Sequence, residues 1–119
     1  MNNHQFLDFE RSFKLWELRY AEPFLAWYSK TGALFLADVE VKELDDNKQI
    51  RAVLKQQAFD WFRERGYDSW SYLNMNGMYS AVVVKDRKSI NLGQFEDYED
   101  SVNARIDKII KLIQKIANA

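Results

Sequence analysis

The chain ends in a segment that constrains its fold more than any other stretch. Between residues 97 and 117, apolar side chains recur at spacings of four, three, four and three residues. This spacing places them on one face of an α-helix, and neither glycine nor proline interrupts the segment. These apolar residues are Val102, Ile106, Ile109, Ile113 and Ile116. A helix with so apolar a face must pack against something, and we expect the β-rich segments before it to provide that surface.

The two ends of this helical segment carry opposite charges. Its first turn is acidic and its last turns are basic, so both ends complement the helix dipole. Ile110 and Leu112 widen the apolar face beyond what contact with one sheet requires. About three heptads are short for an independent coiled coil, so pairing through this helix would need added sheet contacts. A homo-oligomeric structural unit, such as a homodimer, is therefore one hypothesis for the chain.

The composition is that of a folded chain, and it excludes several kinds of site. With 119 residues, 47% hydrophobic and 15% aromatic, the chain is expected to form a single domain over residues 1–119, with residues 1–5 frayed. It contains no cysteine, which excludes disulfides, thiol nucleophiles and zinc–thiolate sites. Its net charge of -1 lacks the basic excess that nucleic-acid-binding domains of this size usually carry.

The sequence shows no targeting or membrane signal. Residues 1–5 have neither the basic nor the apolar region of a signal peptide. No apolar run approaches the roughly 20 residues that cross a bilayer. We therefore expect a cytoplasmic protein with no membrane partner.

No catalytic or metal-binding constellation emerges from the sequence. The one histidine, His4, lies in the terminal tail, where no neighbour fixes its tautomer. The acidic residues at 96–100 coincide with the start of the last helix, where carboxylates stabilise the dipole. We interpret them as structural rather than as a cation site. We expect no enzymatic activity, no cofactor and no metal.

Residues 6–20 fit two interpretations. Aromatic side chains at helical spacing predict an N-terminal helix that ends before Pro23. Leucines on the opposite side leave a strand from Phe13 onward as the alternative. The aromatic residues are Phe6, Phe9, Phe13, Trp16 and Tyr20.

The middle of the chain reads as a hairpin followed by a helix. Residues 23–44 predict two strands joined by a turn at residues 29–32, which ends in glycine. An N-cap among residues 45–47 predicts a helix over residues 48–65, with Ile50, Val53 and Leu54 on its core face. Gly66 is placed to end this helix as its C′ residue.

A second run of strands precedes the last helix. Asn76-Gly77 between β-prone residues predicts a type I′ hairpin turn joining strands at 69–75 and 78–84. Residues 85–88 turn again, and a short strand over 89–92 ends at Gly93. The predicted fold is α+β: an antiparallel sheet of about five strands packed by two long amphipathic helices, with an extra N-terminal helix. In one version, a strands-then-helix plan occurs twice, over 13–66 and 69–118.

Part of the chain resembles a known family. Residues 77–84, the Leu-Gly-Gln-Phe step at 92–95 and residues 98–105 are similar to the AP2 (integrase-type) DNA-binding module. The likeness spans residues 70–115, and it implies a three-stranded sheet crossed by an amphipathic helix. It also implies that Tyr79, Ala81 and Val83 face this helix. The outward positions then hold Ser80, Val82, Val84, Ser89 and Asn91. The family reads DNA there with arginine, tryptophan and glutamate, which this chain does not retain.

These observations favour a small non-enzymatic domain that binds another protein, as an adaptor, an inhibitor, or an immunity or anti-restriction protein. Aromatic side chains often anchor such interfaces. The candidate anchors are Trp27, Tyr28, Phe59, Trp70 and Tyr72. The alternative is an AP2-like nucleic-acid-binding domain, whose candidate phosphate contacts are Lys85, Arg87, Lys88 and Arg105.

Overall fold

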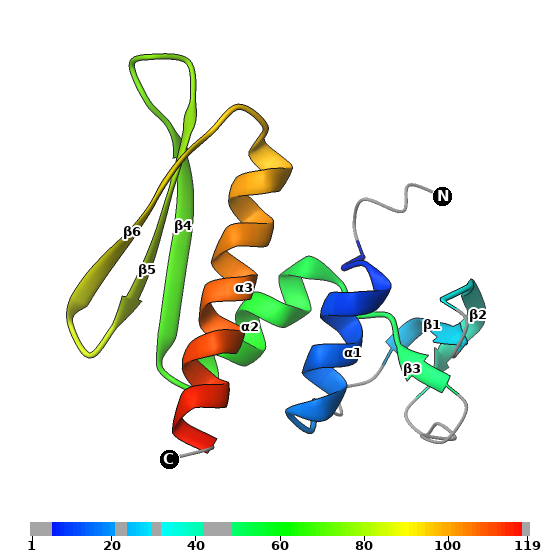
Figure 1. Cartoon of the computed structure of the whole chain (residues 1–119). Helices are drawn as coiled ribbons and strands as arrows, with labels where there is room; N and C mark the ends of the chain where they lie inside the picture. The colour runs from blue at the N-terminus through cyan, green and yellow to red at the C-terminus, as the bar shows by residue number, and fades with distance from the viewer. Residues whose placement is uncertain (1–5, 21–23, 30–31, 42–48, 118–119) are drawn as a thin grey trace. The chain divides into compact units, whose positions relative to one another are not determined.

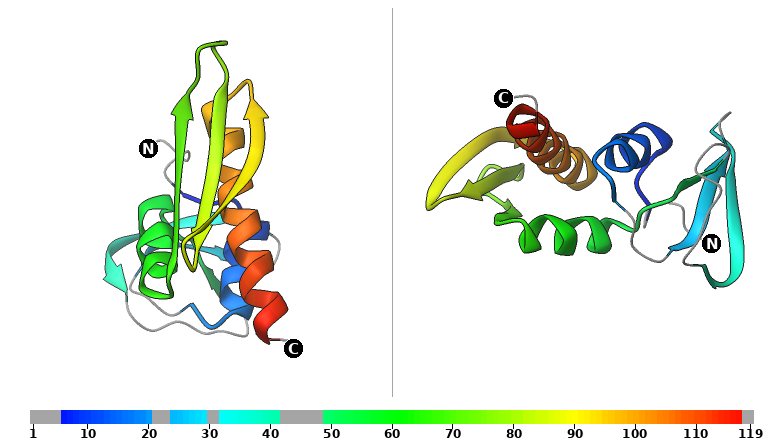
Figure 2. Two further views of the ribbon diagram at one scale, coloured as in Figure 1. Left: turned by 90° about the vertical axis from the view of Figure 1, so that its left-hand side faces the viewer. Right: turned by 90° about the horizontal axis from the view of Figure 1, so that it is seen from below.

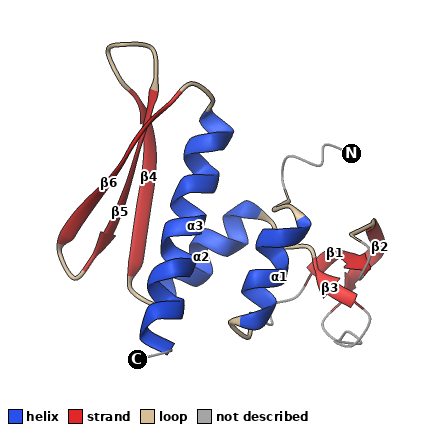
Figure 3. Ribbon diagram, in the orientation of Figure 1, coloured by secondary structure: helices blue, strands red, loops and turns tan. Residues whose placement is uncertain are grey.

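The computed structural model describes residues 6–20, 24–29, 32–41 and 49–117 (Figure 1). Within these residues the chain is α+β, with three helices and antiparallel sheets (Figure 3). It divides into two compact units, Met1–Gln57 and Ala58–Ala119, and each is described by itself. No helix in the described ranges is long and apolar enough to cross a membrane.

The first unit begins with helix α1, Phe9–Glu17. The Asp8 carboxylate caps it by accepting the Arg11 N–H at 3.0 Å. The helix ends in a Schellman motif, in which Arg19 adopts a φ of 69° and the Tyr20 N–H donates to the Leu15 carbonyl at 2.9 Å. Both ends are thus satisfied locally, which confirms the helical interpretation. A strand from Phe13 onward is wrong.

The predicted hairpin is confirmed, and a third strand joins it. Strands β1 (Phe24–Ser29) and β2 (Leu34–Val41) pair antiparallel, and β3 (Gln49–Arg51) pairs with the other edge of β1. The strand order is therefore β2-β1-β3. Gly32, in the turn, has a φ of 88°.

The helix predicted over 48–65 is shorter and starts later. Residues 49–54 are extended because two neighbours pair with them: the Ala52 N–H donates to the Ala26 carbonyl, and the Leu7 N–H donates to the Val53 carbonyl. Helix α2 is Lys55–Glu64, and the Gln57 side chain accepts the Leu54 N–H at 3.4 Å. The predicted caps at 45–47 lie outside the described residues. Gly66, with a φ of 89°, follows α2 as expected.

The second unit continues from α2 into a three-stranded sheet and the last helix. Strands β4 (Tyr67–Leu73), β5 (Tyr79–Lys85) and β6 (Lys88–Phe95) pair in the order β4-β5-β6. Helix α3, Tyr98–Ala117, contacts all three strands from one side. The left panel of Figure 2 looks at this sheet from its other side, with α3 behind the strands.

The predicted single sheet of about five strands is wrong, because each described sheet has three. The strands-then-helix plan does occur twice, as three strands before α2 and three strands before α3, but the two sheets are ordered differently. The central strand is the first of three in one sheet and the second of three in the other.

The apolar face of the last helix is largely confirmed. Val102, Ile106, Ile109 and Ile110 are buried, whereas Ile116 is exposed in the last turn. Burial therefore accounts for most of the wide face that suggested pairing between helices.

The two hairpin turns of this sheet differ from the sequence prediction. At the β4–β5 turn only Gly77 adopts a positive φ, 78°, so Asn76-Gly77 is not a type I′ turn. The loop is longer, because the Asn74 side chain accepts the N–H groups of Asn76 at 2.9 Å and Met78 at 3.2 Å. The type I′ signature instead occurs at the β5–β6 turn, where Asp86 and Arg87 have φ values of 53° and 67°.

Gly93 does not end the third strand. Strand β6 continues to Phe95, and its register with β5 shifts by one residue beside Gly93. With a φ of 102° and its N–H donated to Asn91 Oδ1 at 2.8 Å, Gly93 marks a β-bulge.

Candidate functional site

The sheet of the second unit has two faces of different character. Its inner face lies beneath α3 and contains the buried side chains of Ala81 and Val83. The register then assigns alternate residues to the opposite side, here named the outer face. The outer face consists of Asp68, Trp70, Tyr72, Ser80, Val82, Val84, Ser89, Asn91 and Gln94. These two sides are the ones that the AP2 resemblance implies for the middle strand.

A buried arginine connects α3 to β4 on the inner face. Arg105, on α3, is 7% exposed, and its guanidinium donates to Ser69 Oγ at 3.0 Å, to Ser71 Oγ at 3.0 Å and to the Ser69 carbonyl at 3.1 Å. The centre of the guanidinium also lies 4.1 Å from the centroid of the Phe59 ring. Burial lowers the pKa of Arg105 below its ordinary value.

This placement corrects two candidates. Arg105 was a candidate phosphate contact, but its hydrogen-bond donors are turned toward β4 and its head group is buried. Phe59 was a candidate surface anchor, but its half-buried ring contacts Arg105 and Phe62. Both residues connect the helices and the sheet of this unit.

Two of the predicted anchors lie side by side on the outer face. Trp70 is 44% exposed and Tyr72 is 48% exposed, both on β4. The register places Val82 and Asn91 in the same row as Trp70. Large aromatic side chains in such a position are the commonest anchors of protein interfaces.

The outer face contains no lysine or arginine. Its one charged residue, Asp68, lies 3.6 Å from Nε of Arg63, measured from Oδ1. The remaining residues have aromatic, aliphatic, hydroxyl or amide side chains. The outer face is therefore close to neutral.

The remaining candidates lie apart from Trp70 and Tyr72. Tyr28, in the first unit, is 8% exposed, and its hydroxyl donates to the Leu7 carbonyl at 2.7 Å, so it is a core residue and not a surface anchor. Burial, followed by the charge of Asp8, raises the pKa of Tyr28 above its ordinary value. Trp27 is half-buried on β1.

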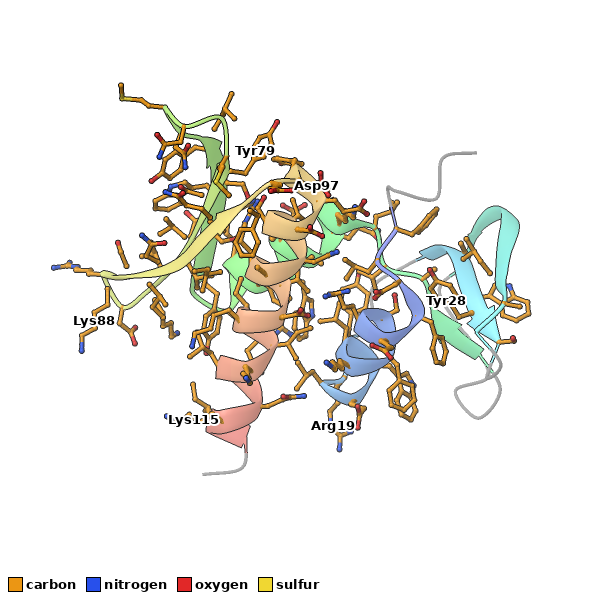
Figure 4. The ribbon with its side chains drawn as sticks, turned by 45° about the horizontal axis from the view of Figure 1, so that its top comes forward. Arg19, Tyr28, Tyr79, Lys88, Asp97 and Lys115 are labelled. Atoms are coloured by element: carbon orange, nitrogen blue, oxygen red, sulfur yellow. The ribbon has the colours of Figure 1, made fainter. Side chains whose placement is uncertain are left out.

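The basic candidates gather at the β5–β6 turn. Lys85 Nζ lies 4.4 Å from the centroid of the Tyr67 ring and donates to the Arg65 carbonyl at 3.4 Å, whereas Arg87 and Lys88 are exposed. Figure 4 shows Lys88 at one end of this unit and Tyr79 with Asp97 at the other.

Sequence reasoning missed the exposed apolar residues at the β4–β5 turn. Leu73 is 62% exposed and Met75 is wholly exposed, next to Tyr72 on the same strand and loop. The signal was present, because Asn74 and Asn76 are turn-forming residues that turn their apolar neighbours toward solvent.

Neither a protein-family model, nor a curated protein, nor a solved structure matches this chain. Within the described ranges, no group of three or more acidic or histidine side chains could hold a metal ion.

Proposed function

We propose that this chain is a small non-enzymatic domain that binds another protein through the outer face of its β4–β5–β6 sheet. The observation that carries the proposal is the pair Trp70 and Tyr72, adjacent on one strand and each nearly half exposed. Such a domain would act as an adaptor, an inhibitor, or an immunity or anti-restriction protein.

The chemistry of the outer face favours a protein partner. Interface cores are enriched in tryptophan and tyrosine and depleted of charged residues. Val82 and Val84 add apolar surface between the strands, and Asn91 and Gln94 offer amide groups that pair with a partner backbone. This combination is an aromatic centre with a polar margin.

The distribution of cations disfavours the nucleic-acid alternative. Aromatic side chains on a sheet can stack on bases, but affinity depends on cations that contact the phosphates. Here Arg105 is buried, and Arg87 and Lys88 lie at a turn rather than on the face that holds Trp70. We expect no gel shift with single- or double-stranded DNA or RNA even at about 50 mM salt, where electrostatic binding is strongest.

The proposal is tested by affinity capture from a native lysate with matched variants. Tagged wild-type protein should retain a partner that survives nuclease treatment, and the double variant Trp70→Ala/Tyr72→Ala should lose it. Removing two anchors of this type typically weakens binding by about 30-fold or more. The control is Lys111→Ala, an exposed position on α3. Equal recovery by wild type and double variant, both folded by circular dichroism, would refute the proposal.

A further inference from the structure

Strand β4 forms one edge of its sheet, so half of its backbone groups point away from β5. The hydrogen bond from the Asn74 N–H to the Met78 carbonyl, 2.8 Å long, sets the phase of the ladder. Hydrogen-bonded pairs recur at every second residue of an antiparallel ladder, so the N–H and C=O groups of the even-numbered residues of β4 bond to β5. The N–H and C=O groups of the odd-numbered residues point to the free edge. These odd-numbered residues are Ser69, Ser71 and Leu73.

This edge is occupied at one end and open at the other. The Ser69 carbonyl accepts from Arg105, and the Ser69 N–H donates to Asp68 Oδ1 at 2.8 Å. No described residue bonds to the edge N–H or carbonyl groups of Ser71 and Leu73. Open edge groups of this kind are a template for a further strand.

The opposite edge of the sheet is protected differently. Strand β6 is interrupted by the bulge at Gly93, whose N–H is taken by the Asn91 side chain. Bulges disturb the regular row of donors and acceptors that a new strand requires. The open half of β4 is therefore the part of this sheet best prepared for pairing.

We propose that this edge pairs with the same edge of a second copy of the chain, the two β4 strands running antiparallel about a two-fold axis at Ser71. Ser71 then faces Ser71 of the second copy, and Leu73 faces Ser69. All of these groups are in phase to exchange main-chain hydrogen bonds, and the Ser69 N–H would give up its bond to Asp68 Oδ1 for the Leu73 carbonyl of the second copy. The Ser69 carbonyl has a second lone pair for this bond while it accepts from Arg105. The two three-stranded sheets become one sheet of six strands.

The side chains of β4 are complementary to themselves in this register. Trp70 lies opposite Tyr72 of the second copy, and the pair occurs twice, since the axis is two-fold. Cross-strand aromatic pairs stabilise antiparallel sheets. Asp68 lies opposite Asn74, so no like charges face each other across the new ladder.

This inference goes beyond the proposed function, because the pairing needs no other protein. It also joins the outer faces of two copies, so that Trp70 and Tyr72 of both chains lie on one continuous surface. A partner that uses this surface would then meet two copies of each aromatic anchor.

The first test is the molar mass of the full chain by light scattering over a concentration series. Wild-type protein should rise from 14.2 kDa to twice that value. Leu73→Pro removes an edge N–H that the sheet does not use, so it should fold and weaken dimerisation by about tenfold or more. Leu73→Ala, the matched control, keeps the N–H and should dimerise. A wild type that stays at 14.2 kDa, or equal dimerisation of the two variants, overturns the proposal.

A second test reads the register and does not depend on proline. Because the chain has no cysteine, introduced thiols are the sole ones present. Chains with Trp70→Cys mixed with chains with Tyr72→Cys should form disulfide-linked heterodimers, since these positions face each other at non-hydrogen-bonded sites with suitable Cα separation. Each variant alone should cross-link much less. If either alone cross-links as well as the mixture, the register is wrong.

The two proposals fail separately. Loss of partner capture by Trp70→Ala/Tyr72→Ala with a monomeric wild type would overturn the pairing and leave the proposed function standing. A wild-type dimer that Leu73→Pro dissociates, with no partner captured by any form, would support the pairing and refute the proposed function.

Discussion

Replacing Arg105 tests the interior of the second unit most directly. The guanidinium makes three hydrogen bonds to β4. Bonds to a charged group contribute about 1.5–3 kcal/mol each, or roughly 4.5–9 kcal/mol for three. Burying a cation costs several kcal/mol, which offsets about half of that sum. Arg105→Ala should therefore lower the free energy of unfolding by about 2–4 kcal/mol.

Urea denaturation measures this loss. With a slope of about 1–3 kcal/mol/M, the midpoint should fall by roughly 1–3 M while the slope stays unchanged. Arg105→Lys is the informative companion, because an ammonium keeps the charge but cannot reach Ser69 and Ser71 together with a planar fork. It should lose about as much stability as the alanine variant.

Two results would refute this reasoning. A loss below about 1 kcal/mol for Arg105→Ala would mean that the three bonds contribute no more than the burial of the charge costs. Full stability for Arg105→Lys would mean that the charge alone matters and the fork geometry does not. Lys111→Ala, an exposed position on the same helix, serves as a control that should leave the midpoint nearly unchanged.

Three further predictions concern stability. Because the pKa of Tyr28 is raised in the folded state, the stability that its neutral hydroxyl contributes is present below pH 10.0, the ordinary pKa, and is lost as pH rises through the folded pKa. Tyr28→Phe should therefore lack this loss of stability at alkaline pH, which urea denaturation at a series of pH values measures. Arg87→Gly should raise the free energy of unfolding by about 0.5–1 kcal/mol, because it relieves a positive φ, whereas Lys88→Gly in the adjoining strand should lower it; thermal unfolding compares them. Asn74→Ala should cost about 1–2 kcal/mol by leaving two turn N–H groups without their acceptor, which chemical denaturation would detect and an unchanged midpoint would contradict.

The sequence predicted secondary structure best in segments where a single local pattern was present and no other pattern contradicted it. The apolar spacing of α3 extends over the whole helix and is not interrupted, so its position follows from periodicity alone. The β1–β2 hairpin is similar, because its turn signal and its alternating strand agree. In these segments, local preference and tertiary packing demand the same conformation.

Prediction failed where a distant segment changed the outcome. Residues 49–54 have helical spacing, but β1 and Leu7 offer them backbone partners from elsewhere in the chain. No local pattern reveals such pairing. Arg105 shows the same effect at the candidate site. From the sequence we expected an exposed cation on a helix, but its side chain is buried and its hydrogen-bond acceptors lie 34 to 36 residues away in the chain. The exposure of Trp70 and Tyr72 agrees with the alternation of large and small side chains along β4, and their role as anchors stays a prediction.

Because the side chain of Met75 is wholly exposed, its rate of oxidation depends on whether another molecule covers the β4–β5 loop. Thioether sulfur is oxidised to the sulfoxide at a rate that follows its exposure, and the half-buried Met78 three residues later supplies an internal reference. Brief peroxide treatment followed by peptide mass spectrometry would therefore report, from the ratio of the two sulfoxides, whether anything covers the tip of this loop. Since the reading needs no label and no substitution, it can be taken on the unaltered chain in whatever mixture it occupies.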